Sequence, residues 1–273
     1  MMSEVSRSRA EPVASGSRRW WRTVRHETAW QIKLYLRTPP AVFFTFAFPI
    51  VLLLVFRWRY DDALFAPLGL SFAEVVVPAI AAIGMVIACY AGLATEVTAA
   101  REKGILKRLR ATPLPPSAYI CARLLSVAGL GALSAFLMVF VGVLFFGATL
   151  HVGSLLLALP VLVVGGACFS ALGLAVASVV PSVGAASAIT NFTLLPLLLF
   201  SGAIVPGQSV PPWLQTLSSL LPLEPFTQGM RAVIGDVGID WPRQLSVLAA
   251  WTLLGIVLAV RYFRWLPRKE LTR

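Results

Sequence analysis

The sequence predicts an all-α membrane protein with six transmembrane helices, and three observations support this prediction. First, 58% of the 273 residues are hydrophobic and 13% are charged, whereas a soluble domain carries about 25% charged residues. Second, apolar runs of about 20 residues, long enough to cross a bilayer as helices, recur along the chain. Third, the Lys and Arg residues behind the net charge of +11 gather in a few segments, as expected for loops on one side of a membrane.

The segment before the first apolar run divides into two parts. Residues 1–17 are polar without periodicity, and we expect a disordered cytoplasmic tail there. Residues 18–37 are amphipathic at the helical period, with mostly apolar residues on one side (Trp20, Trp21, Val24, Thr28 and Tyr35) and cations on the other (Arg18, Arg22, Arg25 and Lys33). Because aromatic residues opposite cations are typical of the membrane interface, we expect an interfacial helix over 18–37.

Six apolar segments have the length of a membrane-spanning helix. They cover about 40–57, 72–95, 118–146, 154–180, 185–205 and 244–263, within one transmembrane domain over 18–265. Residues 1–37 hold eight cations, the linker 96–123 holds six, and the chain after residue 260 holds five. The four other cations are Arg57, Arg59, Arg231 and Arg243. The positive-inside rule therefore predicts a cytoplasmic linker and cytoplasmic termini, including a tail over 266–273.

Residues 200–240 are apolar but too often interrupted to cross the membrane. The interruptions are Pro206, Pro211, Pro212, Pro222 and Pro225. Pro212 and Pro225 suit the first turn of short helices, which we expect at about 213–221 and 226–235. The apolar content favours a re-entrant hairpin in the outer leaflet over an ordinary extracellular loop, the alternative interpretation.

The charged stretch REKGILKRLRATPLPPS, residues 101–117, lies between two apolar segments. As a helix it would carry a narrow apolar stripe of Ile105, Leu106 and Leu109. Cations would lie on the opposite side, and the prolines at 113, 115 and 116 would end the helix. Two interpretations remain: a solvated basic loop that only sets topology, or a short helix offered to a cytoplasmic protein.

The sequence contains no recognisable catalytic constellation. It has two histidines, three isolated cysteines and no GxxxxGK[ST] loop, so we expect no metal site and no ATP-phosphate site in this chain. Glu74 and Glu96 lie near opposite ends of the second apolar segment, which weakens the case for an ion-coupled carrier with a carboxylate at the midplane. Polar residues within the apolar segments could line a pathway or serve helix packing, and both interpretations stay open for Tyr90, Thr190, Asn191 and Thr193.

Two motifs occur in a particular order. The first has a Glu-x-Gly start, a Leu/Arg run and a Thr-Pro-Leu end, carried by Glu102, Gly104, Leu106, Arg108, Leu109, Thr112, Pro113 and Leu114. The second precedes the last apolar segment and is carried by Ser201, Gly202, Pro206, Pro211, Trp213, Leu214, Pro222 and Arg231. In this order the motifs resemble those of ABC-2-type exporter permeases, especially the daunorubicin-resistance-like drug-exporter branch. Ile105 stands where Thr is common in that family.

The resemblance implies a half-transporter that dimerises with itself or with a homologous permease in a bacterial cell membrane. Two copies of a separate ABC ATP-binding subunit would hold ATP-Mg, so this chain would need no cofactor and would not itself be an enzyme. It would move an amphipathic drug or lipid-like substrate outward. The implied ATPase-coupling residues are Arg101, Glu102, Gly104, Ile105, Leu106, Lys107, Arg108 and Leu109. The implied outer re-entrant hairpin contains Pro206, Trp213, Leu214, Leu217 and Arg231.

Two other classes of function remain as alternatives. A six-span channel or ion-coupled secondary transporter would need no ATPase, and an intramembrane enzyme would need catalytic residues that the sequence does not reveal. Co-purification with a cytoplasmic ATPase distinguishes the permease from both.

Overall fold

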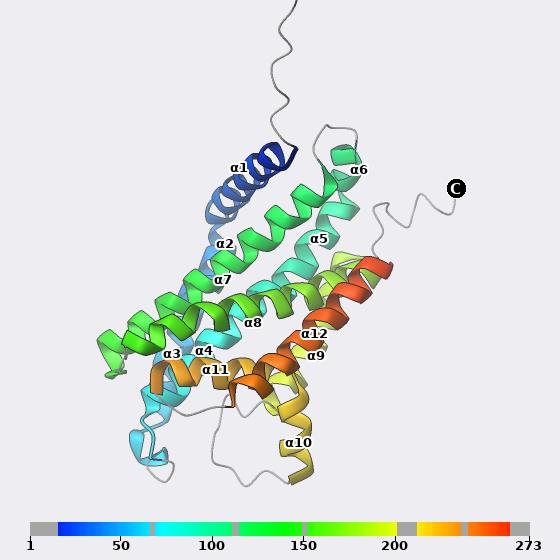
Figure 1. The fold of residues 1–273 in the computed structure, drawn as a ribbon. Helices are drawn as coiled ribbons and strands as arrows, with labels where there is room; N and C mark the ends of the chain where they lie inside the picture. The colour runs from blue at the N-terminus through cyan, green and yellow to red at the C-terminus, as the bar shows by residue number, and fades with distance from the viewer. Residues whose placement is uncertain are drawn as a thin grey trace, which may run out of the picture.

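A computed structural model of the chain describes residues 16–65, 69–110, 115–148, 152–200, 212–235 and 240–262 (Figure 1). All regular structure in these ranges is helical, and they contain no strand. The predictions for residues 1–15, for Pro206 and for the tail over 266–273 lie outside the described residues.

Helix α1 (Gly16–Leu36) packs along the first half of α7 (Pro116–Phe146), so it is docked on the bundle and does not lie free. Val24 of α1 is fully buried against Ala118 and Ala122 of α7. Further contacts along the same face include Gln31, a polar side chain that is buried and that the periodicity of the segment did not predict there. Trp21 was predicted on this face but is 54% exposed, so it does not join the contact with α7.

The first apolar segment forms α2 (Pro39–Val42), a π-helical stretch η1 (Phe43–Ala47) and α3 (Phe48–Arg59). It leads through the short 3₁₀ turn η2 (Asp62–Leu64) to Ser71. Half of the side chains of α3 are exposed on this single chain, and two are buried.

The second apolar segment is the centre of the molecule. It consists of α4 (Phe72–Val86), a π-helical stretch η4 (Ile87–Gly92) and α5 (Leu93–Glu102). Ser71 and Glu74 form a reciprocal capping box that fixes where α4 begins: the Ser71 N–H donates to Glu74 Oε2 at 2.7 Å, and the Glu74 N–H donates to Ser71 Oγ at 3.3 Å. Nearly every residue of α4 is buried.

Helix α8 (Val152–Val179) lies against α12 (Trp241–Tyr262) along much of its length. Small residues allow this approach: a Cβ placed on Gly255 would lie 2.8 Å from the backbone carbon of Ala171. Ala171 of α8 therefore serves helix packing, as small residues commonly do between membrane helices. Helix α9 (Val183–Phe200) follows α8 after a tight turn.

The segment before α12 forms two short helices, α10 (Pro212–Leu220) and α11 (Leu223–Gly235), separated by a turn. Helix α11 enters the bundle and packs on α4 and α8. Phe226 at its start is fully buried over Gly165, where an added Cβ would come within 2.2 Å of the Phe226 ring. The second limb of the predicted hairpin is thus part of the core.

Five of the described helical segments are long and apolar enough to cross a membrane: Pro39–Arg59, Phe72–Glu102, Ser117–Phe146, Ala158–Val179 and Trp241–Tyr262. A further apolar helix, Val183–Leu198, is shorter. The chain is therefore a multi-pass, all-helical membrane protein. One end of the bundle carries α1, the end of α5 and the α8–α9 turn, and we name it the basic end; α10 lies toward the opposite end (Figure 1).

Candidate functional site

The candidate coupling segment begins where α5 ends. Gly104 has a φ of 67°, and its N–H donates to the Arg101 carbonyl at 3.1 Å, which closes the last turn of α5. Glycine adopts this left-handed conformation without steric cost, which is why it commonly follows a helix. The chain then turns directly into α6 (Ile105–Arg110), so two residues, Lys103 and Gly104, separate the two helices.

Leu106 anchors α6 on the bundle. It is 1% exposed and packs with Ala100 of α5 and Tyr119 of α7. Ile105, predicted on the same stripe, is 40% exposed, and Lys107 and Arg108 are exposed beside it. The side chain of Leu109 lies outside the described set. Helix α6 thus offers an outward surface of one aliphatic and two cationic side chains.

Arg101 and Glu102, also predicted to be coupling residues, both contact the α8–α9 turn, Arg101 from a buried position and Glu102 from an exposed one. Arg101 is 7% exposed, and its guanidinium donates to the carbonyls of Ala177, at 2.8 Å, and Val180. Glu102 Oε1 accepts a hydrogen bond from the Val183 N–H at 3.2 Å. The two adjacent residues therefore bind the end of α8 and the start of α9.

A second group of polar contacts ties α1, α5 and α7 together at the basic end. Glu96 of α5 forms an ion pair with Arg123 of α7. Ser126 Oγ of α7 donates to Gln31 Oε1 of α1 at 3.1 Å, and Gln31 in turn donates to Glu27 at 3.0 Å. Glu96 is thus engaged in a helix–helix contact.

The junction between α1 and the first apolar segment is also held by a side-chain contact. The Tyr35 and Thr45 hydroxyls hydrogen-bond to each other. Burial raises the pKa of the Tyr35 phenol, and the bond with Thr45 opposes that rise. Tyr35 therefore stays neutral at physiological pH and keeps its proton available for this bond.

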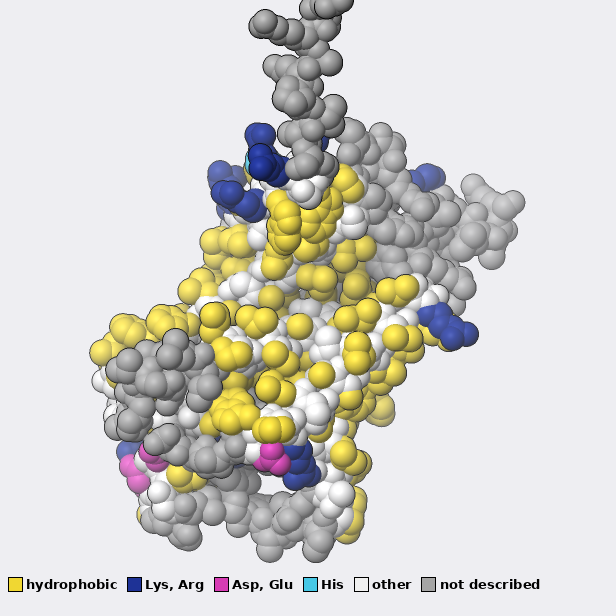
Figure 2. Space-filling view, viewed as in Figure 1, with side chains coloured by type: hydrophobic (Ala, Val, Ile, Leu, Met, Phe, Trp, Pro, Cys, Tyr) yellow, Lys and Arg dark blue, Asp and Glu magenta, His cyan; other side chains and the backbone are white. Residues whose placement is uncertain are grey.

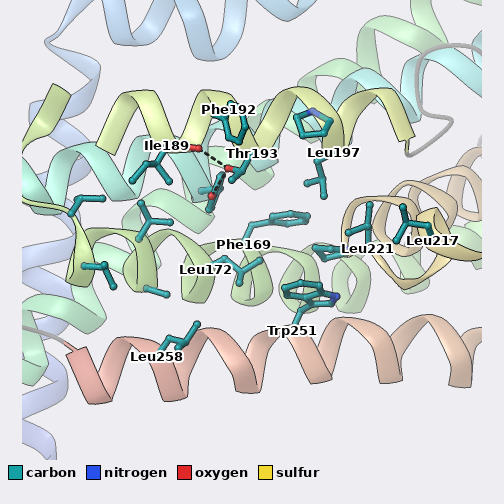
Figure 3. Close-up of a pocket in the computed structure, with 17 residues that line it drawn as sticks. Phe169, Leu172, Ile189, Phe192, Thr193, Leu197, Leu217, Leu221, Trp251 and Leu258 are labelled. Atoms are coloured by element: carbon teal, nitrogen blue, oxygen red, sulfur yellow. Dashed lines mark hydrogen bonds between the residues drawn. The ribbon is translucent and has the colours of Figure 1, made fainter. Parts of the chain in front are cut away.

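An apolar groove of about 600 Å³ lies between α8, α9 and α12 (Figure 3). Helix α8 forms its floor, α9 and α12 form its walls, and the α10–α11 turn closes one end. The main lining residues are Phe169, Leu172, Val176, Ile189, Phe192, Leu197, Leu217, Leu221, Trp251 and Leu258.

The polar atoms of the groove lining bind other protein atoms. The Tyr90 and Thr193 hydroxyls are 2.7 Å apart and hydrogen-bond to each other across η4 and α9. Trp251 Nε1 donates to the Leu220 carbonyl at 2.8 Å. The groove therefore suits a hydrocarbon ligand, because a ligand does not have to satisfy these groups.

The four predicted pathway residues separate in the structure. Tyr90 and Thr193 meet at the groove. Thr190 is buried and donates to the Ala186 carbonyl at 2.8 Å, so it serves the helix. Asn191 is exposed on the outer side of α9. The sequence did not identify the lining residues on α8 and α12, because apolar groove residues look like any lipid-facing or core residue.

The predicted hairpin residues also take different positions. Trp213 is exposed, and Leu217 lies on the rim of the groove. Arg231 is half-buried within α11, and the Leu214 side chain lies outside the described set.

Several apolar helices that can cross a membrane, a basic segment at one end and an apolar groove between helices are the features of a membrane transport protein. In agreement, residues 24–234 match the family described as ABC-2 type transporter, and the chain belongs to this family. It is therefore a membrane component of the ABC-2 type of transporter. The predicted resemblance to ABC-2-type permeases is confirmed, and the drug-exporter branch stays a prediction.

Two curated proteins are similar over part of the chain. Nodulation protein J of Rhizobium leguminosarum bv. trifolii is 29% identical over 112 residues, which make up 41% of this chain and 43% of that protein. Nodulation protein J of Neorhizobium galegae is 28% identical over 112 residues, with the same coverage. The chain thus spans less than half the length of the curated relatives it matches.

Proposed function

We propose that this permease is half of a dimeric exporter that moves an amphipathic drug or lipid-like substrate outward, driven by two copies of an ABC ATP-binding subunit. Family membership supports the permease role. The apolar groove between α8, α9 and α12 is the observation that supports an amphipathic substrate.

The orientation that we propose has six spans, with α9 as the fifth, and places the basic end in the cytoplasm. Figure 2 shows Lys and Arg side chains grouped around α1 at that end, whereas the acidic side chains in view lie at the other end. The positive-inside rule assigns the cation-rich loops to the cytoplasm. Helix α6 would then face the ATP-binding subunit, and the α10–α11 hairpin would lie in the outer leaflet.

In this proposal the groove holds the hydrocarbon part of the substrate. Its lining is almost wholly carbon, and its hydroxyls are already paired, so a strongly hydroxylated ligand gains nothing from it. The polar part of the substrate would lie outside the groove, beside the partner permease. The nodulation relatives do not by themselves distinguish a drug from another amphipathic compound.

The proposal is tested by co-expression with the ATP-binding subunit from the adjacent reading frames and transport into inside-out vesicles. We expect the two chains to co-purify and a fluorescent amphipathic dye to accumulate only with ATP. Transport of the dye by the purified chain alone, without ATP, would instead support the channel or secondary-transporter alternative.

A groove variant tests the substrate assignment separately. Leu172→Trp should fill the floor of the groove and lower dye transport, whereas Leu159→Trp, on an exposed part of the same helix outside the groove, should not. Equal transport by the two variants would show that the substrate does not bind in this groove.

A further inference from the structure

The end of α5 and the α8–α9 turn are joined by two neighbouring residues that point to opposite sides of that turn. Arg101 binds the last turn of α8 through the carbonyls of Ala177 and Val180. Glu102 binds the first N–H of α9, on Val183. Helix ends leave carbonyls and N–H groups without helical partners, and a cation suits the carboxyl end while an anion suits the amino end. Each charge here lies at the matching helix end.

We propose that Arg101 and Glu102 form a strut that makes the α5–α6 segment and the α8–α9 turn move as one body. They are then positioning residues that transmit force, and not contact residues of the ATP-binding subunit. This inference rests on the proposed function in one respect: it assumes that the ATP-binding subunit docks on α6.

The contacts have the properties of a rigid joint. Arg101 is almost completely buried, and its planar guanidinium bonds two carbonyls, that of Ala177 in the last turn of α8 and that of Val180 just after it. Such charge-assisted, forked contacts fix direction as well as distance, and burial strengthens them because water does not compete. Lysine carries the same charge but lacks the fork, so it cannot reproduce this geometry.

The strut provides a direct route from the docking surface to the groove. Only Lys103 and Gly104 separate α6 from α5, and Arg101 and Glu102 are the last two residues of α5. Helix α9 begins at Val183 and forms a wall of the groove through Ile189 and Phe192. Displacement of α6 would therefore move the groove wall through two bonded residues, without requiring a rearrangement of α7.

Spectroscopy can test whether the two segments move together. Spin labels at Lys103→Cys and Gly184→Cys, both exposed positions, would report the distance across the strut after replacement of Cys89, Cys121 and Cys168. In the complex with the ATP-binding subunit, we expect the same narrow distance distribution with and without trapped nucleotide. In Arg101→Lys the distribution should broaden and depend on nucleotide.

The amount of substrate moved per ATP hydrolysed gives a second test of the strut, and a variant that simply failed to fold would not give the expected result. In Arg101→Lys and Glu102→Ala the complex should still form and hydrolyse ATP, but substrate moved per ATP should fall roughly tenfold, within the usual range of coupling between sites. Glu102→Gln keeps an oxygen that accepts the Val183 N–H and should restore near-normal coupling.

The outcomes separate the strut from the proposed function. If the wild-type chains do not co-purify, the proposed function is wrong. If they do, but Arg101→Lys and Glu102→Ala keep normal coupling and an unchanged label distance, the strut is wrong. Equal loss of coupling in Glu102→Ala and Glu102→Gln would also overturn it, because the charge and not the bond to Val183 would then be responsible.

Discussion

Gly104 is the residue at which the chain turns from α5 into α6, and its backbone conformation sets the direction of α6. Because no atom lies within 4 Å of a Cβ built there, the cost of a side chain is conformational and not steric. We predict that Gly104→Ala destabilises the protein by about 1–2 kcal/mol, the cost of a left-handed residue. Gly104→Asn should cost less, since Asn tolerates this conformation better.

Thermal unfolding of the detergent-solubilised protein measures this ranking. The wild type should melt highest, Gly104→Asn next and Gly104→Ala lowest. An alanine variant as stable as the wild type would contradict the strained-turn explanation.

Arg108 has a different role from its neighbour in the motif, Glu102. It is exposed on α6, whereas Glu102 is bonded to the α8–α9 turn. We predict that Arg108→Glu weakens co-purification of the ATP-binding subunit, by reversing a charge on the docking surface. Arg59→Glu, at the opposite end of the bundle, is the matched control and should leave the complex intact.

For single residues, the sequence predicted the apolar face of a helix better than it predicted the contacts that each residue makes. Periodicity placed Leu106 and Val24 on buried faces, and the structure buries both. It could not separate Ile105 from Leu106, because the face that α6 buries depends on Tyr119, which lies beyond the prolines that end the segment. The bonds of Arg101 depend on residues about 76–79 positions away, and no local pattern encodes such a contact.

Among the described helices, α8 and α12 share an extensive contact, which depends on the absence of a side chain at Gly255. We predict that Gly255→Leu separates the two helices and costs about 1–3 kcal/mol, as over-packing usually does. Gly129→Leu is the control: it lies on the exposed side of α7, with nothing within 4 Å of an added Cβ.

The measurement is the apparent melting temperature in detergent, together with yield from the membrane. Gly255→Leu should lower both, and Gly129→Leu neither. If the two variants behave alike, the close approach of α8 to α12 does not limit stability.

The helical elements were largely predictable because the apolar runs are long. The second span is the informative exception: its apolar run ends near residue 95, whereas the helix continues to Glu102. Hydropathy detects only the part of a helix that is apolar enough for lipid. It therefore misses the end of α5, where polar residues bind neighbouring helices. The π-helical stretches had no counterpart in the sequence pattern either.

For the molecule as a whole, the exposed side of α9 that carries Asn191 indicates where the second permease of the proposed dimer would lie. The Asn191 amide donates to Ser187 Oγ at 3.5 Å within α9, but the side chain is exposed on this chain. Facing an amide toward hydrocarbon with part of its hydrogen-bonding capacity unmet is unfavourable. We therefore predict that this side of α9 is covered by a partner permease in the membrane.

Disulfide cross-linking between copies in native membranes checks this prediction. Asn191→Cys should give a cross-linked dimer, whereas Val163→Cys, exposed on α8, should not. If Val163→Cys cross-links and Asn191→Cys does not, the dimer uses another face.

The class of the protein, a multi-pass membrane protein, was predictable from composition and charge distribution. The groove and the bonded contact between α5 and α9 were not. Apolar content and the placement of cations depend on the solvent, so they can be read position by position. The groove arises from packing between three separate helices, α8, α9 and α12, and the α5–α9 junction joins residues 81 positions apart in the chain. Leu172 and Leu258 can be recognised as groove-lining residues only once the packing of those helices is known.

The paired hydroxyls of Tyr90 and Thr193 have a consequence for pharmacology. An apolar groove would give a hydrocarbon ligand the same kind of environment as the surrounding lipid, so the groove and the bilayer would compete for that ligand. The selectivity of the groove among ligands would then follow from their molecular shape and chain length. Higher overall hydrophobicity would raise a ligand's concentration in the bilayer without improving its fit to the groove. Potencies of different compounds should therefore be ranked by their mole fraction in the membrane, and a ranking by dose in the surrounding water would mostly report partitioning.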